Sequence, residues 1–479
     1  MHLQKFIILA AAVLLSVSAV NAQFPQSNVA EYAKGVAIEK VVAASDPSQS
    51  YALYLPSAYN PARKSPILYC FDPGARGSLP VSRFKDAAEK YNYIVVGSNN
   101  SRNGPNQPLN DIIKILWEDT HARFSIDEKR TYLAGFSGGA RVAISLGYSL
   151  KGLVAGVIAC SGGFPSRISP STPLPFVLFE TAGSEDFNNP EMQSLSRTIA
   201  GSLVANRLAV FEGGHDWLPA ELALDAIEWM EIQAMRTGMK AKDEELIDKL
   251  FGKALTRARA AEAAKEGYLA YSYYAAAAQD FQGLRAVTEF QQKVAALKDA
   301  KEVREAFKRE QWIAEEQARR LLSIDSLIGA LGQSENKMKT LSEVRHSIAI
   351  QKKAAAAEQS SAERVVARRV INSVFVGSFE QGSAAIFQKD YQRAIIHFSI
   401  GTEIQPDNAR TFYQLARAYA LAKDNRKAIG ALHMAAEKGF IDLEALAGDE
   451  FVRLRNEKRF NEINEFVRNN RAAAENKRN

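Results

Sequence analysis

The pattern of apolar and polar residues divides the chain into two regions. From residue 38 to residue 211, short apolar runs alternate with longer amphipathic stretches. The short runs predict buried strands and the stretches between them predict helices, so we expect a mostly parallel sheet covered on both faces. From about residue 239 no strand pattern remains, and Ala, Lys, Glu, Arg and Gln recur with helical spacing. The sequence therefore predicts an α/β domain followed by an all-helical region.

The elements of the first region follow from the lengths of these runs. Near-continuous apolar segments predict buried parallel strands, and one more such segment leads into a turn at residue 137. Segments with apolar residues at every third or fourth position predict helices. We expect strands at 38–43, 51–56, 66–71, 93–97, 155–160, 175–181 and 207–211, and helices at 80–91, 109–124, 191–203 and 219–236. This alternation is typical of a doubly wound sheet.

The end of the second region repeats with a period of 34 residues. Small residues recur where two helices would touch, and large residues recur where they would pack on the next hairpin. The matched positions are Gly382, Ala394, Phe398 and Pro406 in one unit and Ala416, Ala428, Leu432 and Phe440 in the next, with Tyr419 and Ala435 in addition. Residues 376–442 thus resemble a tetratricopeptide-repeat protein. A generic array of helical hairpins is the alternative, and it predicts a similar shape.

These patterns give the expected domain organisation. The α/β domain is expected at 23–238, followed by a helical region at 239–370 that consists of degenerate repeats or of long helices. Its most charged section, 298–369, favours a pair of long, partly exposed helices. The repeat-like domain is expected at 371–479 and ends in a capping helix at 453–466.

The first 22 residues have the pattern of a signal peptide. His2 and Lys5 precede the apolar run 6–20, and Val20-Asn21-Ala22 supplies the small residues of a cleavage site. The apolar run is short for a permanent membrane span. We therefore expect an exported protein without an integral membrane segment after cleavage, periplasmic in preference to extracellular.

Composition and charge narrow the function classes. The 479 residues are 47% hydrophobic and 24% charged, with a net charge of +6. The basic excess lies beyond residue 238 and is thinly spread, so no nucleic-acid partner is expected. Two cysteines and six scattered histidines offer no metal cluster, and no cofactor is expected. Cys70 and Cys160 should end strands separated by a third strand, roughly 10 Å apart, which predicts two buried free thiols.

Candidate chemistry begins at Gly135-Phe136-Ser137-Gly138-Gly139. An apolar strand ends here and a helical pattern follows at once, which predicts a sharp turn with Ser137 in strained backbone. A Cβ at Gly135 or Gly139 would clash with the neighbouring strand or helix. The serine oxygen would lie at a helix N-terminus, where an oxyanion is favoured. The motif indicates a nucleophile. A glycine-rich turn with an incidental serine is the plainer alternative.

A serine nucleophile needs a histidine base, which should follow it in the sequence. Three histidines lie in the helical region and one lies in the signal peptide. His121 lies in the helix before the serine turn, where a surface or packing role is expected. His215 remains, in the loop after the last strand, and Gly213-Gly214 leaves it room to reach the serine. We therefore assign His215 as the base.

The orienting acid should follow the strand at 175–181. Asp186, in Gly183-Ser184-Glu185-Asp186, is the predicted acid, with Glu185 as the fallback. Asp216 is adjacent to His215 and can hardly fold back to orient it. We expect Asp216 to cap the helix that begins near residue 219.

The oxyanion hole needs two backbone N–H groups. Gly138, after the serine, is expected to supply one. The other should come from the loop after the third strand, where Pro73 has no N–H, so Gly74 is the predicted donor and Ala75 the alternative. Arg76 is expected to pair with Asp72, and contact with an anionic substrate group is its alternative role.

Residues 36–238 resemble an α/β-hydrolase domain of the esterase, dienelactone-hydrolase and prolyl-oligopeptidase-like type. The resemblance rests on four motifs: Tyr51-Ala52-Leu53-Tyr54-Leu55-Pro56-Ser57-Ala58-Tyr59, Ile126-Asp127, Arg130-Thr131-Tyr132-Leu133-Ala134-Gly135-Phe136-Ser137-Gly138-Gly139, and Gly213-Gly214-His215. It implies that fold and a triad of Ser137, Asp186 and His215. The His-Gly dipeptide usual in the third-strand loop of this family is replaced by Asp72-Pro73, which alters the oxyanion site.

The sequence thus predicts an exported serine hydrolase that acts on carboxylic esters in preference to peptide bonds. The substrate would be a small ester or an acyl group linked to a peptide or polysaccharide. The helical repeats would bind a protein or peptide partner. The alternative is a non-catalytic binding or assembly protein with a degenerate hydrolase domain.

Overall fold

The computed structural model describes residues 32–104, 108–165, 174–200, 204–331, 337–358 and 361–476. These residues form two compact units, each with its own hydrophobic core. The first unit extends to Arg304, and the second begins at Glu305 and also includes the short segment Glu185–Phe187. The expected signal peptide, residues 1–22, lies outside the described residues.

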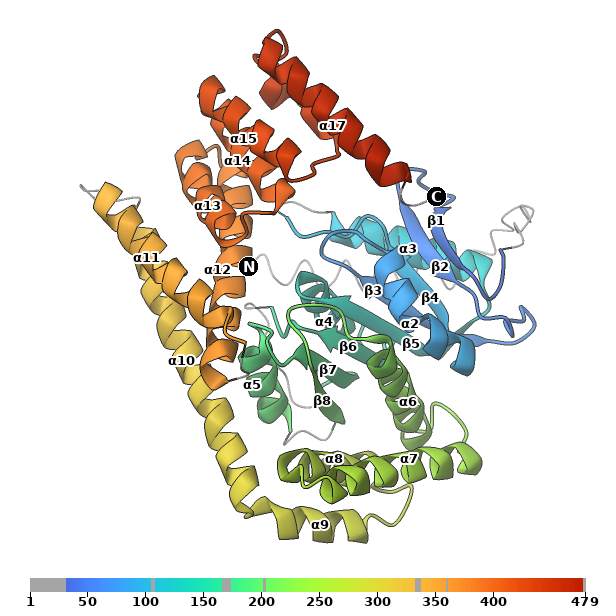
Figure 1. The fold of residues 1–479 in the computed structure, drawn as a ribbon. Coiled ribbons are helices and arrows are strands. Elements are labelled where there is room, and N and C mark those ends of the chain that lie inside the picture. The colour runs from blue at the N-terminus through green and yellow to red at the C-terminus, as the bar shows by residue number, and fades with distance from the viewer. Residues whose placement is uncertain are drawn as a thin grey trace, which may run out of the picture. The chain divides into compact units, whose positions relative to one another are not determined.

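The first unit contains a sheet with the strand order β1-β2-β4-β3-β5-β6-β7-β8 among the described residues (Figure 1). β2 pairs antiparallel with β1 and β4, and every pair from β4 to β8 is parallel. The strands are β1 (Ala37–Val42), β2 (Ser50–Tyr54), β3 (Ser65–Phe71), β4 (Ile94–Ser98), β5 (Ile126–Phe136), β6 (Gly156–Cys160), β7 (Val177–Gly183) and β8 (Asn206–Phe211). The predicted mostly parallel sheet is confirmed, and the carboxyl ends of its parallel strands meet at one edge.

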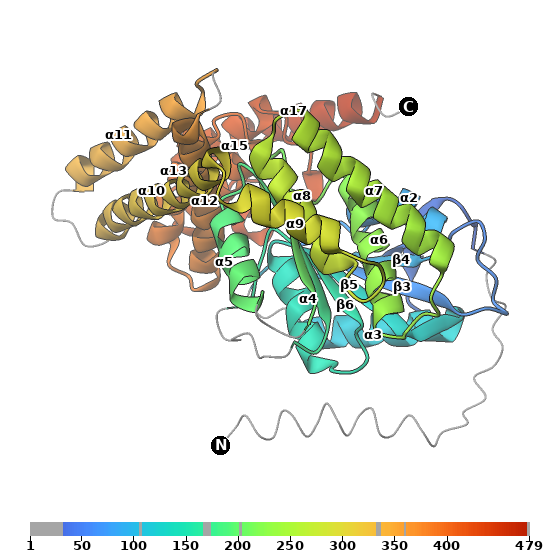
Figure 2. The same cartoon turned by 90° about the horizontal axis from the view of Figure 1, so that it is seen from below.

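Helices cover both faces of this sheet. Leu116 of α3, Ile144 of α4 and Met192 of α5 belong to the core on one face, whereas Phe84 of α2 and Met230 of α6 belong to the core on the other. Figure 2 shows α3 and α4 on one side of the sheet and α6 on the opposite side. The bounds are α2 (Ser78–Tyr91), α3 (Leu109–Arg123), α4 (Gly138–Ser149), α5 (Asn189–Ile199) and α6 (Ala220–Arg236). The doubly wound arrangement is confirmed.

Side chains along each strand alternate between the two faces of the sheet, so a single strand contributes residues to the hydrophobic core on each face. On β3, Tyr69 and Phe71 point into one core, while Leu68 and Cys70 point into the other. Cys70 on β3 and Cys160 on β6 are buried free thiols, and β5 lies between their strands. Both statements match the expectation from the sequence.

Three further helices belong to the first unit, namely α7 (Glu244–Ala263), α8 (Gly267–Asp280) and α9 (Thr288–Lys298). Ile232 and Met235 of α6 share a hydrophobic core with Ile247 of α7, Tyr274 of α8 and Phe290 of α9. The expected boundary at residue 238 separates the sheet domain from α7, whereas the compact unit continues to Arg304.

The second unit is helical throughout its described residues apart from turns. Its helices are α10 (Lys301–Leu331), α11 (Lys337–Ala355), α12 (Ala362–Phe387), α13 (Tyr391–Ile404), α14 (Ala409–Leu421), α15 (Asn425–Glu437), α16 (Leu443–Leu446), the short 3₁₀ helix Asp449–Phe451, and α17 (Lys458–Asn476). The predicted all-helical region is confirmed. Among the described helices of the whole chain, none combines the length and the apolar character needed to cross a bilayer.

The turns before α13 and α15 have the same construction. Asp390 and Asp424 cap these helices, and each side chain accepts a hydrogen bond from the N–H three residues later. The residues just before them, Lys389 and Lys423, have φ values of 61° and 65°. The two turns lie 34 residues apart in the sequence, which matches the expected period. The resemblance to tetratricopeptide repeats stays a prediction.

Glu180 is a carboxyl group buried in the middle of β7. Asn206 Nδ2 lies 3.4 Å from its Oε2, and its Oε1 has no hydrogen-bonding partner among the described residues. Burial raises the pKa of Glu180 to about 8, although hydrogen bonds to Asn206 and Ser196 act in the opposite direction. Below that pH the residue is held as the neutral acid.

We expect the free energy of unfolding to fall as pH rises from 4.5 to about 8, the ordinary and the folded pKa of Glu180. In this window the unfolded chain has lost the proton and the folded chain keeps it, so the slope is at most about 1.4 kcal/mol per pH unit. Glu180→Gln is expected to flatten this dependence, because the amide is neutral throughout. Urea denaturation across the window measures the slope, and Glu39→Gln, on the exposed part of β1, is the control. Equal slopes for wild type and Glu180→Gln would contradict the expectation.

Candidate active site

The turn between β5 and α4 has the strained geometry that its glycines predict. Ser137 has φ 52° and ψ −117°, a region that non-glycine residues rarely adopt. A Cβ on Gly135 would lie 2.1 Å from the carbonyl oxygen of Gly139, and a Cβ on Gly139 would lie 1.9 Å from that of Phe71. The N–H of Ser137 donates to Cys160 O at 2.8 Å. The close approach of β3, β6 and the start of α4 therefore enforces this conformation and holds a half-buried serine at the carboxyl edge of the sheet.

The N-terminus of α4 begins directly after the serine. Gly138 is the first residue of this helix, so its N–H has no partner within the helix. The helix dipole places partial positive charge at the same point. This position suits the predicted role of Gly138 as an oxyanion donor, and that role stays a prediction.

His215 lies in the loop between β8 and α6 and is half-buried. Its ring lies 4.6 Å, centroid to centroid, from the ring of Phe136, the residue before Ser137. A Cβ on Gly183, the last residue of β7, would lie 2.3 Å from Gly214 O, so the histidine loop rests on the end of that strand. The structure therefore brings the candidate base to the serine turn.

The two candidate acids differ in their surroundings. Asp186 is fully buried, and both residues lie in the segment Glu185–Phe187, which belongs to the second compact unit. The carboxylate of Glu185 accepts hydrogen bonds from Arg368 Nη1 at 2.6 Å and from Arg364 Nη2 at 3.3 Å. Because two guanidinium groups already hold Glu185, Asp186 is the better candidate of the two. Its role in orienting His215 stays a prediction.

The helix-cap interpretation of Asp216 is wrong. Its carboxylate accepts a hydrogen bond from the N–H of the next residue, Trp217, at 2.7 Å and lies 3.5 Å from Arg83. The N-cap of α6 is Pro219, which supplies no side-chain hydrogen bond. Asp216 lies three residues before the N-cap of α6. Its carboxylate instead accepts a hydrogen bond within the loop that precedes the helix.

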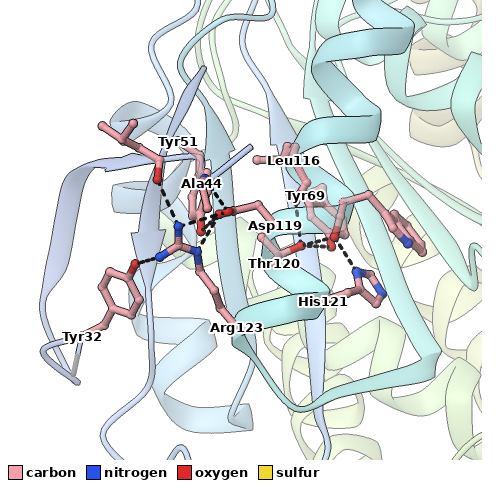
Figure 3. Close-up of polar contacts among 11 residues, drawn as sticks. Tyr32, Ala44, Tyr51, Tyr69, Leu116, Asp119, Thr120, His121 and Arg123 are labelled. Carbon is pink, nitrogen blue, oxygen red and sulfur yellow. Dashed lines mark hydrogen bonds and ion pairs between the residues drawn. The ribbon is translucent and has the colours of Figure 1, made fainter. Parts of the chain in front are cut away.

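His121 has the packing role expected of it. Its Nδ1 lies 2.8 Å from Trp117 O, and the two rings stack with their centroids 4.5 Å apart. Its Nε2 lies 3.3 Å from Glu128. Figure 3 shows His121 on α3, near the end of the helix that leads into β5. These contacts account for the residue without a catalytic role.

Figure 3 also shows a buried carboxylate on α3 that reasoning from the sequence did not identify. Asp119 accepts hydrogen bonds from the hydroxyl of Tyr51 at 2.8 Å, from the N–H of Ala44 at 2.8 Å, and from the guanidinium of Arg123. Burial and the neighbouring Asp119 charge raise the pKa of Tyr51. The network ties α3 to β2 and to the end of β1, so we assign it a structural role.

The loop after β3 is organised around the buried carboxylate of Asp72. This carboxylate accepts hydrogen bonds from Gly74 N–H at 2.8 Å and from Arg76 Nε and Nη2 at 2.8 and 2.9 Å. It also accepts one from Trp217 Nε1, in the histidine loop, at 2.9 Å. The expected pairing of Arg76 with Asp72 is confirmed. The N–H of Gly74 already has an acceptor, so its predicted oxyanion role competes with Asp72.

Asn103 is the residue at this edge that reasoning from the sequence missed. Its N–H donates to Pro73 O at 2.8 Å, and a Cβ on Gly138 would lie 2.0 Å from its Oδ1 and 2.6 Å from its Nδ2. Its side-chain amide therefore lies against the residue after the serine. The signal in the sequence was only a polar loop following β4.

Among the described residues no group of three or more histidine, cysteine or acidic side chains is arranged to hold a metal ion.

A comparison with models of known protein families gives a match for the region around the serine turn. Residues 96–191 match the family model described as Phospholipase/Carboxylesterase. The match contains Ser137 and Asp186 and ends before His215. Together with the sheet order, it identifies an α/β-hydrolase domain in the first half of the chain. No curated protein sequence gives a significant match.

Several solved structures are similar to part of the chain. The fluorophosphonate-binding serine hydrolase F of Staphylococcus aureus has 13% identity and a TM-score of 0.34, over 41% of this chain and 97% of that one. The Bacillus cereus carboxylesterase has 17% identity and a TM-score of 0.32, over 40% and 96%. The esterase of Pyrobaculum calidifontis has 11% identity and a TM-score of 0.33, over 49% and 92%.

Proposed function

We propose that the α/β-hydrolase domain hydrolyses carboxylic esters with Ser137 as nucleophile, His215 as base and Asp186 as the orienting acid. The observation that carries this proposal is the strained backbone of Ser137, held by two glycines against neighbouring strands. Such strain persists only where the surrounding structure enforces it, and it is common at catalytic positions. The ring of His215 beside Phe136 supports the same assignment.

The proposed reaction is acyl transfer in two halves. His215 takes the proton of Ser137 Oγ as that oxygen attacks the ester carbonyl, and the resulting oxyanion accepts a hydrogen bond from the N–H of Gly138. Collapse of the tetrahedral intermediate expels the alcohol, which receives the proton from His215. Water then attacks the acyl-enzyme by the same steps in reverse, releasing the acid and restoring the serine.

We favour esters over peptides as substrates because residues 96–191 match a phospholipase and carboxylesterase model. The substrate class we propose is a small ester, or an acyl group carried by a peptide or polysaccharide.

We further propose export to the periplasm after cleavage following Ala22, and a partner-binding role for the helical second unit. The repeated turns at Asp390 and Asp424 support that last proposal, because stacked helical hairpins form extended binding surfaces. A mature chain that begins at Gln23 in the periplasmic fraction is the expected result for export. A chain that retains residues 1–22 in the cytosol contradicts it.

The second candidate function is a non-catalytic assembly protein. The observation that favours it is the N–H of Gly74, which donates to Asp72 in place of an open oxyanion site. A scaffold of this kind would keep the fold and the helical unit and would lose turnover. It predicts that Ser137 is unreactive toward acylating and phosphylating reagents.

The experiment that separates the two functions is covalent labelling of the full chain with a fluorophosphonate, followed by peptide mass spectrometry. The serine hydrolase is expected to show one stoichiometric adduct on the peptide that contains Ser137, because only an activated serine reacts quickly. Parallel assays with short-chain nitrophenyl esters and with a peptide amide compare the two bond types. Prior heat denaturation is the control for nonspecific labelling. No adduct on the native protein, and no turnover above buffer, would establish the scaffold.

A further inference from the structure

The predicted oxyanion hole lacks its second donor in the loop after β3. The N–H of Gly74 donates to the carboxylate of Asp72 at 2.8 Å, and the N–H of Ala75 donates to the carbonyl oxygen of Asp72 at 3.0 Å. Both predicted donors are thus used within their own loop. A substrate oxyanion would compete with a buried carboxylate for the Gly74 N–H, and the two negative charges would repel each other. The second donor must therefore come from another element at this edge of the sheet.

The loop after β4 supplies a side chain at the required place. The amide of Asn103 lies against Gly138, where a Cβ on that glycine would be 2.0 Å from Oδ1 and 2.6 Å from Nδ2. Gly138 carries the first oxyanion donor, so the amide lies beside the position at which a reacting carbonyl oxygen would be held. Asn103 is an exposed residue, so a bound substrate can reach it. The absence of a side chain at Gly138 is what allows this approach.

The backbone of Asn103 is held in place by the loop after β3. Its N–H donates to Pro73 O at 2.8 Å, and the preceding residue, Arg102, forms an isolated antiparallel bridge with Gly74. The two loops are thus joined at Asn103 itself and at the residue before it. A donor fixed in this way need not reorganise as charge develops, which is what makes an oxyanion donor effective.

We propose that the side-chain amide of Asn103 is the second oxyanion donor of this site, with the backbone N–H of Gly138 as the first. The inference rests on the proposed serine-hydrolase function. In the tetrahedral intermediate the former carbonyl oxygen accepts one hydrogen bond from Gly138 N–H and one from Asn103 Nδ2–H. Nδ2 also lies against Gly138, 2.6 Å from the position of a Cβ on that residue, so the amide brings an N–H donor group to this point.

This assignment explains how the chain can carry Asp72-Pro73 where related domains have His-Gly. Pro73 has no N–H, and Asp72 uses the N–H of Gly74. The loop after β3 then serves as a support: its Pro73 carbonyl holds Asn103, and its Asp72 carboxylate holds Trp217 of the histidine loop at 2.9 Å. The second oxyanion donor is then supplied by the loop after β4 instead of the loop after β3.

The test compares Asn103→Ala and Asn103→Asp with wild type in the full chain, using a short-chain nitrophenyl ester. Loss of one oxyanion donor is expected to lower kcat by about 100- to 1000-fold and to leave KM within about threefold, because the bond forms only in the transition state. Affinity for a trifluoromethyl ketone, which forms a tetrahedral adduct on the serine, is expected to fall in proportion to kcat/KM. Asn60→Asp, an exposed turn residue between β2 and β3, is the matched control and is expected to keep wild-type kinetics.

Three results would overturn the inference. A kcat within about threefold of wild type in both variants would remove Asn103 from the reaction. A change in KM alone, or a fall in activity that tracks a lower melting temperature, would assign it a binding or structural role. A wild-type protein without Ser137-dependent turnover would refute the proposed function, and the inference with it. That case is distinct, because wild type and Ser137→Ala would then be indistinguishable.

Discussion

Ser137→Ala is expected to abolish ester hydrolysis by the full chain, with kcat lowered by at least about 10⁴-fold. No other group at the turn can form the acyl-enzyme, so His215 and the helix N-terminus are left without a nucleophile. The fold should survive, because alanine is smaller than serine and the bond from the N–H of residue 137 to Cys160 O is kept. Steady-state kinetics with a nitrophenyl ester and fluorophosphonate labelling measure the loss.

The strain at Ser137 gives this prediction a second readout. Glycine adopts a φ of 52° without strain, so Ser137→Gly is expected to raise the free energy of unfolding by about 1 kcal/mol relative to wild type. The variant is also expected to be inactive, because it lacks the hydroxyl group. Ser145→Ala, two turns further along α4, is the control, because the Ser145 hydroxyl donates to Arg141 O within the same helix. Residual Ser137→Ala turnover equal to that of wild type would show that the activity comes from another site.

Asp72→Ala is expected to lower the free energy of unfolding by about 2–4 kcal/mol and kcat by about 10- to 100-fold. The carboxylate is completely buried, and its loss leaves the indole N–H of Trp217 without its acceptor. Trp217 is itself buried and lies two residues after His215, so the histidine loop loses its anchor to the loop after β3. Denaturant unfolding and ester kinetics on the same protein measure the two effects.

Arg76→Ala is the matched control for Asp72. It removes the ion pair but keeps the bonds of Asp72 to Gly74 and Trp217, and the Arg76 side chain is 57% exposed, so the expected cost is smaller than that of Asp72→Ala. Asp72→Asn should fall between the two, since the amide keeps the shape of the side chain and loses its charge. Equal effects of Asp72→Ala and Arg76→Ala on stability would show that the ion pair, rather than the bond to Trp217, is what matters.

The elements of the sheet domain could be predicted because each depends on a local pattern. The run 66–71 reads as a buried strand because both faces of that strand are covered, as β3 (Ser65–Phe71) shows. The serine turn could be predicted because only glycine tolerates the close approaches at Gly135 and Gly139. Elimination among a few histidines placed His215 in the loop that the structure brings to this turn. Its catalytic role, and that of Asp186, stay predictions.

Other features depend on contacts that no local pattern encodes. The role of Asp216 was misjudged because a cap requires a side chain within reach of the first N–H groups of the helix, and α6 begins at Ala220. The helices α7 to α9 join the first unit through their core with α6, although their composition matches the helical region that follows. Composition recognises a helix, but it does not determine what that helix packs against.

The sequence by itself determined the class of the fold, the position of the serine turn and the histidine of the loop beside it. These depend on the spacing of apolar residues and on glycines that are required where they stand. Only the tertiary structure decided which loops meet at the carboxyl edge. Asn103 lies against Gly138 because the order β4-β3-β5 brings their loops to the same part of this edge. Asp72 bonds to Trp217, 145 residues later in the chain, although β5, β6 and β7 lie between β3 and β8, because the loop after β8 extends back to the end of β3. Contacts between residues so far apart in the chain depend on strand order and on the paths of the loops, which the sequence pattern of a single element does not contain.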